Sequence, residues 1–139
     1  MRRPIIRAVL LLALLAGTSA CGDDEGTPTD PTPTRPTTTE TFSGTLTVNG
    51  AATHPFTATG SGTMTLTLTT LSPDSAATIG VSLGTFNGTT CQIVLANDNA
   101  TQGAVVTGNA GAAGNFCARV YDVGRLGAPT DYTLTVVHF

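Results

Sequence analysis

The sequence predicts an all-β protein, an antiparallel β-sandwich of about eight strands that follows a disordered tether. Apolar and polar residues alternate with period 2 in several segments, as they do in strands with one buried and one solvated face. Clusters of Gly, Asn, Asp, Ser and Pro separate these segments and predict turns. No segment has the 3.6-residue apolar period of an amphipathic helix.

Residues 1–20 have the pattern of an export signal. Arg2, Arg3 and Arg7 precede an apolar run over residues 8–17. This run of about ten residues is too short to span a bilayer, which takes about 20. The small residues Thr18, Ser19 and Ala20 that follow it suit a signal peptidase, so we expect cleavage there.

Cys21 directly follows these small residues, and residues 15–21 resemble the lipobox of bacterial lipoproteins. The resemblance implies that the Cys21 thiol carries a diacylglycerol and that the chain is cut just before it. Thr18 departs from the pattern, in which Leu is usual. The alternative is an ordinary cleavage site that leaves Cys21 as a free thiol. A lipid anchor would place the protein in the cell envelope, and Asp23, two residues after Cys21, favours the outer membrane in a Gram-negative host.

Residues 21–40 form a linker in this interpretation. An acidic start is followed by T-P-T-D-P-T-P-T-R-P-T-T-T at residues 27–39, which offers almost nothing apolar to bury. Proline favours the extended polyproline II conformation, at about 3.1 Å per residue. We therefore expect a tether that lifts the domain off the membrane, the alternative being a disordered linker with no selected length.

The domain is assigned to residues 41–139. Its clearest strands are T-F-S-G-T-L-T-V at residues 41–48, T-M-T-L-T-L-T at 63–69 and Y-T-L-T-V at 132–136. Threonine suits the solvated face because β-branching favours the pleat. Further strands are expected near residues 54–59, 78–83, 91–95, 104–107 and 116–122, and turns near 49–50, 60–62, 72–74, 87–88, 97–99 and 108–114.

One stretch, N-F-C-A-R-V-Y-D-V-G with P-T-D-Y-T-L-T-V, residues 115–136, resembles the C-terminal half of the bacterial pre-peptidase C-terminal domain. Residues 54–71 are similar to an earlier hairpin of that family. The resemblance implies a jelly-roll-like β-sandwich, and an accessory module of the kind found beside secreted proteases, here without a protease.

Cys91 and Cys117 remain once Cys21 is assigned to the anchor. Export leads to an oxidising compartment, so we expect a disulfide between them. It would close a loop of about 27 residues and stabilise the fold by roughly 3–4 kcal/mol. A redox or metal pair is the alternative, but there is no C-x-x-C and no nearby histidine.

The residues that could support catalysis are few, and we expect no enzyme activity. The only histidines, His54 and His138, are interpreted as polar residues at strand ends, and the chain has no lysine. The domain's aspartates, Asp74, Asp98, Asp122 and Asp131, are far apart in the sequence, whereas acid–base work by two carboxylates needs a pair in one cleft.

No cofactor or metal is expected. Asn97–Asn99 is the best cluster of oxygen ligands, but calcium takes six to eight oxygens, so Asp98 and Asp122 are only weak candidates. They could share a cation only if the strands of the two cysteines ran parallel. The preferred interpretation of Asn97–Asn99 is an Asx-rich turn.

The expected partners are a membrane, through Cys21, and an unknown protein or glycan. Nucleic acid is excluded as a partner, because three arginines against nine acids after Cys21 give a net charge of −6 without any lysine. We expect a module for protein interaction or envelope structure. The alternative, a carbohydrate-binding module, is disfavoured because sugar sites usually stack on exposed aromatic rings, and the chain has no tryptophan.

Overall fold

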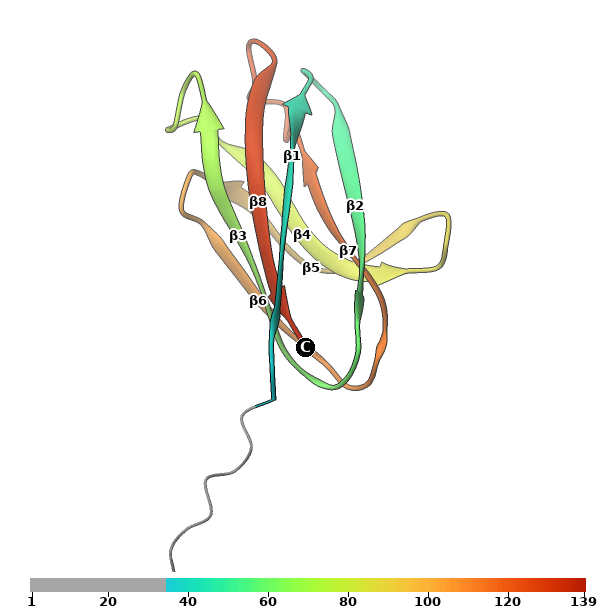
Figure 1. The fold of residues 1–139 in the computed structure, drawn as a ribbon. Coiled ribbons are helices and arrows are strands. Elements are labelled where there is room, and N and C mark those ends of the chain that lie inside the picture. The colour runs from blue at the N-terminus through green and yellow to red at the C-terminus, as the bar shows by residue number, and fades with distance from the viewer. Residues whose placement is uncertain (1–34) are drawn as a thin grey trace, which may run out of the picture. The chain divides into compact units, whose positions relative to one another are not determined.

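A computed structural model describes residues 35–139 and contains eight β-strands there (Figure 1). They are β1 (Thr38–Leu46), β2 (Ala51–Ala58), β3 (Gly62–Ser72), β4 (Ile79–Phe86), β5 (Cys91–Ala100), β6 (Val105–Ala110), β7 (Gly114–Tyr121) and β8 (Thr130–His138). Within this part of the chain no helix is long and apolar enough to cross a membrane.

The strands form two four-stranded sheets, in the orders β1-β8-β3-β6 and β2-β7-β4-β5. All the neighbouring pairs are antiparallel. β1 pairs with β8, β2 with β7, β3 with β6 and β4 with β5. The chain therefore resembles one long hairpin that has folded over on itself. This is the arrangement of an eight-stranded jelly roll, so the predicted fold class is confirmed.

The core lies between the sheets and follows the alternation in the sequence. Leu66, Leu134 and Val136 of one sheet and Val81 and Val120 of the other are fully buried. The intervening threonines form cross-strand ladders on the outer face of the first sheet, where the Thr69 and Thr135 hydroxyls are 2.8 Å apart. Each such pair contributes about 0.2–1 kcal/mol, so the threonine-rich face stabilises the sheet.

Two strand predictions need correction. β1 begins at Thr38 rather than Thr41 and ends at Leu46, so Val48 lies in the following turn, 42% exposed. The hairpin expected within residues 54–71 is wrong, because β2 and β3 lie in different sheets. The turn between them carries the chain from one sheet to the other, and the alternation in each strand cannot distinguish such a crossover from a hairpin.

The turn predicted at Asn97–Asn99 is also wrong, since these residues lie within β5. Between Ile79 and Val81 of β4 the pairing register shifts, and β5 has an extra residue there. This is a β-bulge, in which the Asn97 side chain accepts a hydrogen bond from the Asn99 amide at 3.0 Å. Asparagine supports the bulge for the same reason that it favours turns, because its side chain bonds the local backbone.

Candidate functional site beside the Cys91–Cys117 disulfide

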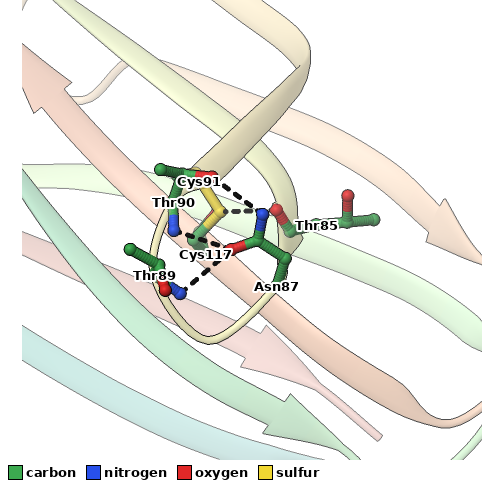
Figure 2. The surroundings of a disulfide bond; sticks show 6 residues. All are labelled: Thr85, Asn87, Thr89, Thr90, Cys91 and Cys117. Atoms are coloured by element: carbon green, nitrogen blue, oxygen red, sulfur yellow. Dashed lines mark hydrogen bonds between the residues drawn. A yellow bond between two sulfur atoms is a disulfide. The ribbon is translucent and has the colours of Figure 1, made fainter.

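The structure contains the predicted disulfide between Cys91 and Cys117 (Figure 2). The Cα atoms are 5.8 Å apart, and Cys117 is fully buried. Cys91 opens β5 and Cys117 lies within β7. The bond therefore joins β4–β5, the only hairpin within one sheet among residues 35–139, to a strand that is not a neighbour of β5.

A glycine makes this connection possible. β4 lies between β5 and β7, and Gly84 is the register partner of both Ile93 and Cys117. A second register shift occurs there, with Val94 as the extra residue of β5. A Cβ on Gly84 would overlap the Gln92 carbonyl. The start of β5 thus passes over β4 at a point where only glycine fits, which brings Cys91 to Cys117.

The loop that precedes Cys91 is ordered by one side chain. Asn87 accepts hydrogen bonds from the amides of Thr89 and Thr90 at 2.9 and 2.8 Å and donates to the Thr90 hydroxyl at 2.9 Å. Figure 2 shows these residues beside the disulfide. The predicted turn at Asn87–Gly88 is confirmed, and Gly88 has the left-handed φ of +95° that such a turn requires.

This loop, β2 and β7 enclose a recess of about 400 Å³ on the outer face of the second sheet. Its lining consists of Ala51, Thr53, Thr89, Thr90, Cys91 and Arg119. We call it the Arg119 recess, because Arg119 is its only charged residue. Figure 1 shows the β4–β5 loop on the same side as β2 and β7, away from the rest of β5.

Arg119 is held from one side by an aromatic ring. Its guanidinium carbon lies 5.6 Å from the centre of the Tyr121 ring, and the Tyr121 hydroxyl donates to Asp98. Burial, followed by the hydrogen bond and the charge of Asp98, raises the pKa of Tyr121 to about 12. Tyr121 therefore remains a neutral donor at physiological pH, and its ring supports the cation through its π face.

Asp98 and Asp122 lie toward the same end of the sheet, because β5 and β7 are each antiparallel to β4 and so run in the same direction. Both carboxylates have protein partners. Asp122 accepts hydrogen bonds from the amides of Asn49, Gly124, Arg125 and Leu126 at 2.8–3.1 Å. The Asn49 amide contributes most to lowering the Asp122 pKa. Among residues 35–139 no three acidic, histidine or cysteine side chains gather as a metal site would need.

Of the two histidines predicted to be polar residues at strand ends, His138 lies at one and His54 does not. His54 is the fourth residue of β2, stacks on Phe42 and lies 2.8 Å from the Tyr132 hydroxyl through Nε2. Burial lowers the His54 pKa. His138 is the last residue of β8, but it is buried, and its Nε2 contacts Glu40 at 2.9 Å. Both histidines join strands, and neither faces the Arg119 recess.

One motif was missed by sequence reasoning. Residues 80–84 read G-V-S-L-G, which matches the G-x-S-x-G pattern of hydrolase nucleophiles. That pattern needs a strand–turn–helix context that exposes the serine. Here Ser82 lies within β4, and its buried hydroxyl has no hydrogen-bond partner among the described residues. The small residues are explained by packing instead, since the Tyr121 ring covers Gly80 and β5 covers Gly84.

A second, apolar cleft of about 430 Å³ lies between β5 and β6. Met64, Leu83, Leu95 and Phe116 contribute to its lining, together with the glycines and alanines of the β6–β7 turn, and none of the lining residues is charged. Its polar side chains are Thr85, Asn109 and Asn115, which suit a neutral, largely apolar ligand. The Arg119 recess is the candidate for a charged ligand, because of the two it alone contains a charged side chain.

Comparison with known proteins adds no relative, since no family model and no curated protein matches the chain. Cys21, the predicted site of lipidation, lies outside the described residues.

The Arg119 recess could not be predicted from the sequence, because its residues come from three separate segments. The one sequence signal near it is the set of small residues at positions 80, 82 and 84. Small residues at every second position indicate that another part of the chain packs closely against one face of that strand.

Proposed function

We propose that this chain is a non-catalytic lipoprotein of the cell envelope, anchored through Cys21, which displays a β-sandwich for protein interaction or envelope structure. The sequence of residues 1–40 supports the anchor and the tether. Similarity to pre-peptidase C-terminal domains supports an accessory role, and β7 and β8 are the strands that carry this similarity.

The proposal that the protein is non-catalytic rests on one observation: its titratable side chains are engaged in contacts that hold the fold together. His54 contacts Tyr132, His138 contacts Glu40, and Asp122 binds four backbone amides. Nucleophilic catalysis needs a nucleophile within about 3 Å of a base. Ser82, the residue that matches a nucleophile motif, has no such neighbour among the described residues. These groups stabilise the fold and have little capacity left for chemistry.

Arg35 supports the display of the domain on a tether. Its guanidinium donates to the backbone carbonyls of Ser61 and Thr59 at 3.0 and 3.3 Å and lies 5.7 Å from the centre of the Phe139 ring. The sandwich is therefore held from Arg35 onward.

Fractionation of a bacterial host that expresses the full chain tests the anchor. We expect the wild-type protein in the membrane fraction, labelled by a clickable fatty acid, and the Cys21→Ser variant unlabelled. A wild-type protein that is soluble in the periplasm contradicts the anchor. Catalysis is tested separately on generic ester, peptide and glycoside substrates, where activity that is lost in Ser82→Ala would contradict the non-catalytic part.

A further inference from the structure

Arg119 is a cation without a protein partner for its charge. Its backbone belongs to the ladders of β7, but no hydrogen bond or ion pair joins its guanidinium to another residue of the segment 35–139, where the only ion pair found is His138–Glu40. A guanidinium has five N–H donors in a planar fork. Because Arg119 is half-buried and lines the recess, it places a positive charge at a space that a ligand can enter.

We infer that the Arg119 recess binds a carboxylated sugar of the hexuronate class. The guanidinium fork matches a carboxylate, which it binds through two parallel hydrogen bonds. Thr53, Thr89 and Thr90 also line the recess, and the Thr90 hydroxyl, which accepts from Asn87, keeps its proton for donation. A hydroxyl both donates and accepts, so these threonines suit the hydroxyls of the sugar ring. Recognition would depend on charge and hydrogen bonds rather than on stacking against an aromatic ring.

The lining favours this ligand over an acidic peptide. Peptide sites use apolar pockets for anchor side chains or add a strand to an open sheet edge. The apolar part of this lining is small, Ala51 and Cys91 with the threonine methyl groups. β2 is an edge strand, but Thr53 of β2 and Arg119 of β7 are register partners that both line the recess, so it opens on the face of the sheet. The volume of about 400 Å³ lies at the lower end of the usual range of about 300–1,000 Å³ for ligand sites. It suits one sugar residue, or one residue of a longer glycan.

The recess is also pre-organised, which lowers the entropy lost on binding. The disulfide fixes Cys91, and the Asn87 side chain fixes the amides of Thr89 and Thr90. On the other side, the Tyr121 ring supports Arg119, while its hydroxyl holds Asp98 outside the lining. Asp98, the acid on β5, thus bonds to Tyr121 and does not belong to the lining, which leaves the Arg119 guanidinium without a direct ion pair.

The test uses the full chain, purified in detergent, with sodium D-glucuronate as the probe, followed by calorimetry and by amide NMR shifts. We expect saturable binding, with the largest shifts at Thr53, Thr89, Thr90 and Arg119. Arg119→Ala should weaken binding about tenfold or more, since a hydrogen bond to a charged group is worth about 1.5–3 kcal/mol. Arg119→Lys should bind glucuronate more tightly than Arg119→Ala but more weakly than wild type, because an ammonium lacks the planar fork of donors.

The matched control is Arg125→Ala. Arg125 donates to Asn99 at 2.9 Å and does not line the recess, so we expect its loss to leave glucuronate binding unchanged. Dispersed amide spectra establish that each variant is folded. If Arg119→Ala does not fold, Thr53→Val and Thr90→Val take its place, and each should weaken binding.

Four competing ligands separate the alternatives. Methyl glucoside should bind far more weakly than glucuronate, because it lacks the carboxylate, and acetate should be weak because it lacks the ring. Binding of inorganic phosphate or of an acidic peptide as tightly as glucuronate would overturn the inference, as would glucuronate binding that survives in Arg119→Ala or no binding at all. The measurement does not depend on the lipid at Cys21, so the anchor and this site can fail independently.

Discussion

At the scale of the residue, single polar side chains hold together segments that the sheets do not. Asp122 is the clearest example, since it joins the β1–β2 turn to the segment after β7 through Asn49 and residues 124–126. A carboxylate that accepts several backbone amides favours its charged form. The residue that the sequence marked as a weak metal ligand is therefore a structural acceptor.

The lowered pKa of Asp122 predicts acid sensitivity. A carboxyl whose folded pKa is depressed stabilises the fold fully above its unfolded pKa, about 3.9. That contribution is lost as the pH falls through the folded pKa. In Asp122→Asn we expect lower stability than wild type at neutral pH and a difference that shrinks at acid pH, measured by urea unfolding across this range.

Asp74→Asn is the matched control, because the Asp74 side chain accepts a single hydrogen bond, from the Ala76 amide at 2.9 Å. We expect a smaller loss of stability at neutral pH. An Asp122→Asn variant that keeps wild-type stability from neutral to acid pH would contradict the role assigned to Asp122.

At the scale of the element, β5 is an edge strand shaped by two register shifts, and its start folds over β4. Bulges at an edge interfere with pairing to a further strand. This is significant because Ile93 and Val94 are 46% and 68% exposed. The irregularities that re-aim Cys91 toward Cys117 thus also protect an apolar edge that has neither lysine nor proline.

The crossing at Gly84 predicts a steep cost for one added methyl group. In Gly84→Ala the new Cβ would overlap the Gln92 carbonyl, and overpacking of this kind costs about 1–3 kcal/mol. Nothing lies near a Cβ at Gly127, so Gly127→Ala is the control and should stay within about 0.5 kcal/mol of wild type. Urea unfolding measures both variants, and equal stabilities would contradict the close crossing.

The disulfide makes a second prediction for the same element. The double variant Cys91→Ser/Cys117→Ser should lose about 2–5 kcal/mol of stability. Mass spectrometry after alkylation, with and without reductant, shows whether the bond is present in the purified chain. Alkylation of Cys91 and Cys117 without reductant would contradict it.

At the scale of the whole molecule, the nested pairing brings together residues that are far apart in the chain. β1 pairs with β8 over nine register partners, from Thr38 opposite His138 to Leu46 opposite Thr130. The sandwich is complete only when the first and last strands meet. Long-range pairing of this kind slows folding, because loop-closure entropy is lost before the contacts form.

This topology predicts that residues 35–139 fold alone, in one cooperative transition and slowly for their size. Stopped-flow refolding should give relaxation in the millisecond-to-second range that is typical of β-sandwiches. Microsecond refolding, or a fragment that stays unfolded without residues 1–34, would contradict the expectation.

The number and approximate position of the strands could be predicted from the sequence, because period-2 alternation and turn residues are local signals. The pairing of the strands could not be predicted from the sequence. Apolar and polar residues alternate in β2 and β3 in the same way whether the two strands form a hairpin or lie in different sheets. The turn predicted at Asn97–Asn99 failed because asparagine gives the same local hydrogen bond in a turn and in a bulge. The Cys91–Cys117 bond followed from the cysteine count, but the recess beside it depends on the crossing at Gly84, which is a tertiary feature.

The contacts of Arg35 determine how the domain would bear a mechanical load. A pull on residue 35 is transmitted to β1, which has one neighbour in its sheet, β8. A pull directed along β1 would shear its ladder of hydrogen bonds with β8, so that the bonds share the force instead of opening one after another. A ligand held in the Arg119 recess would apply the opposing force on the other sheet, so tension would pass through the packed core.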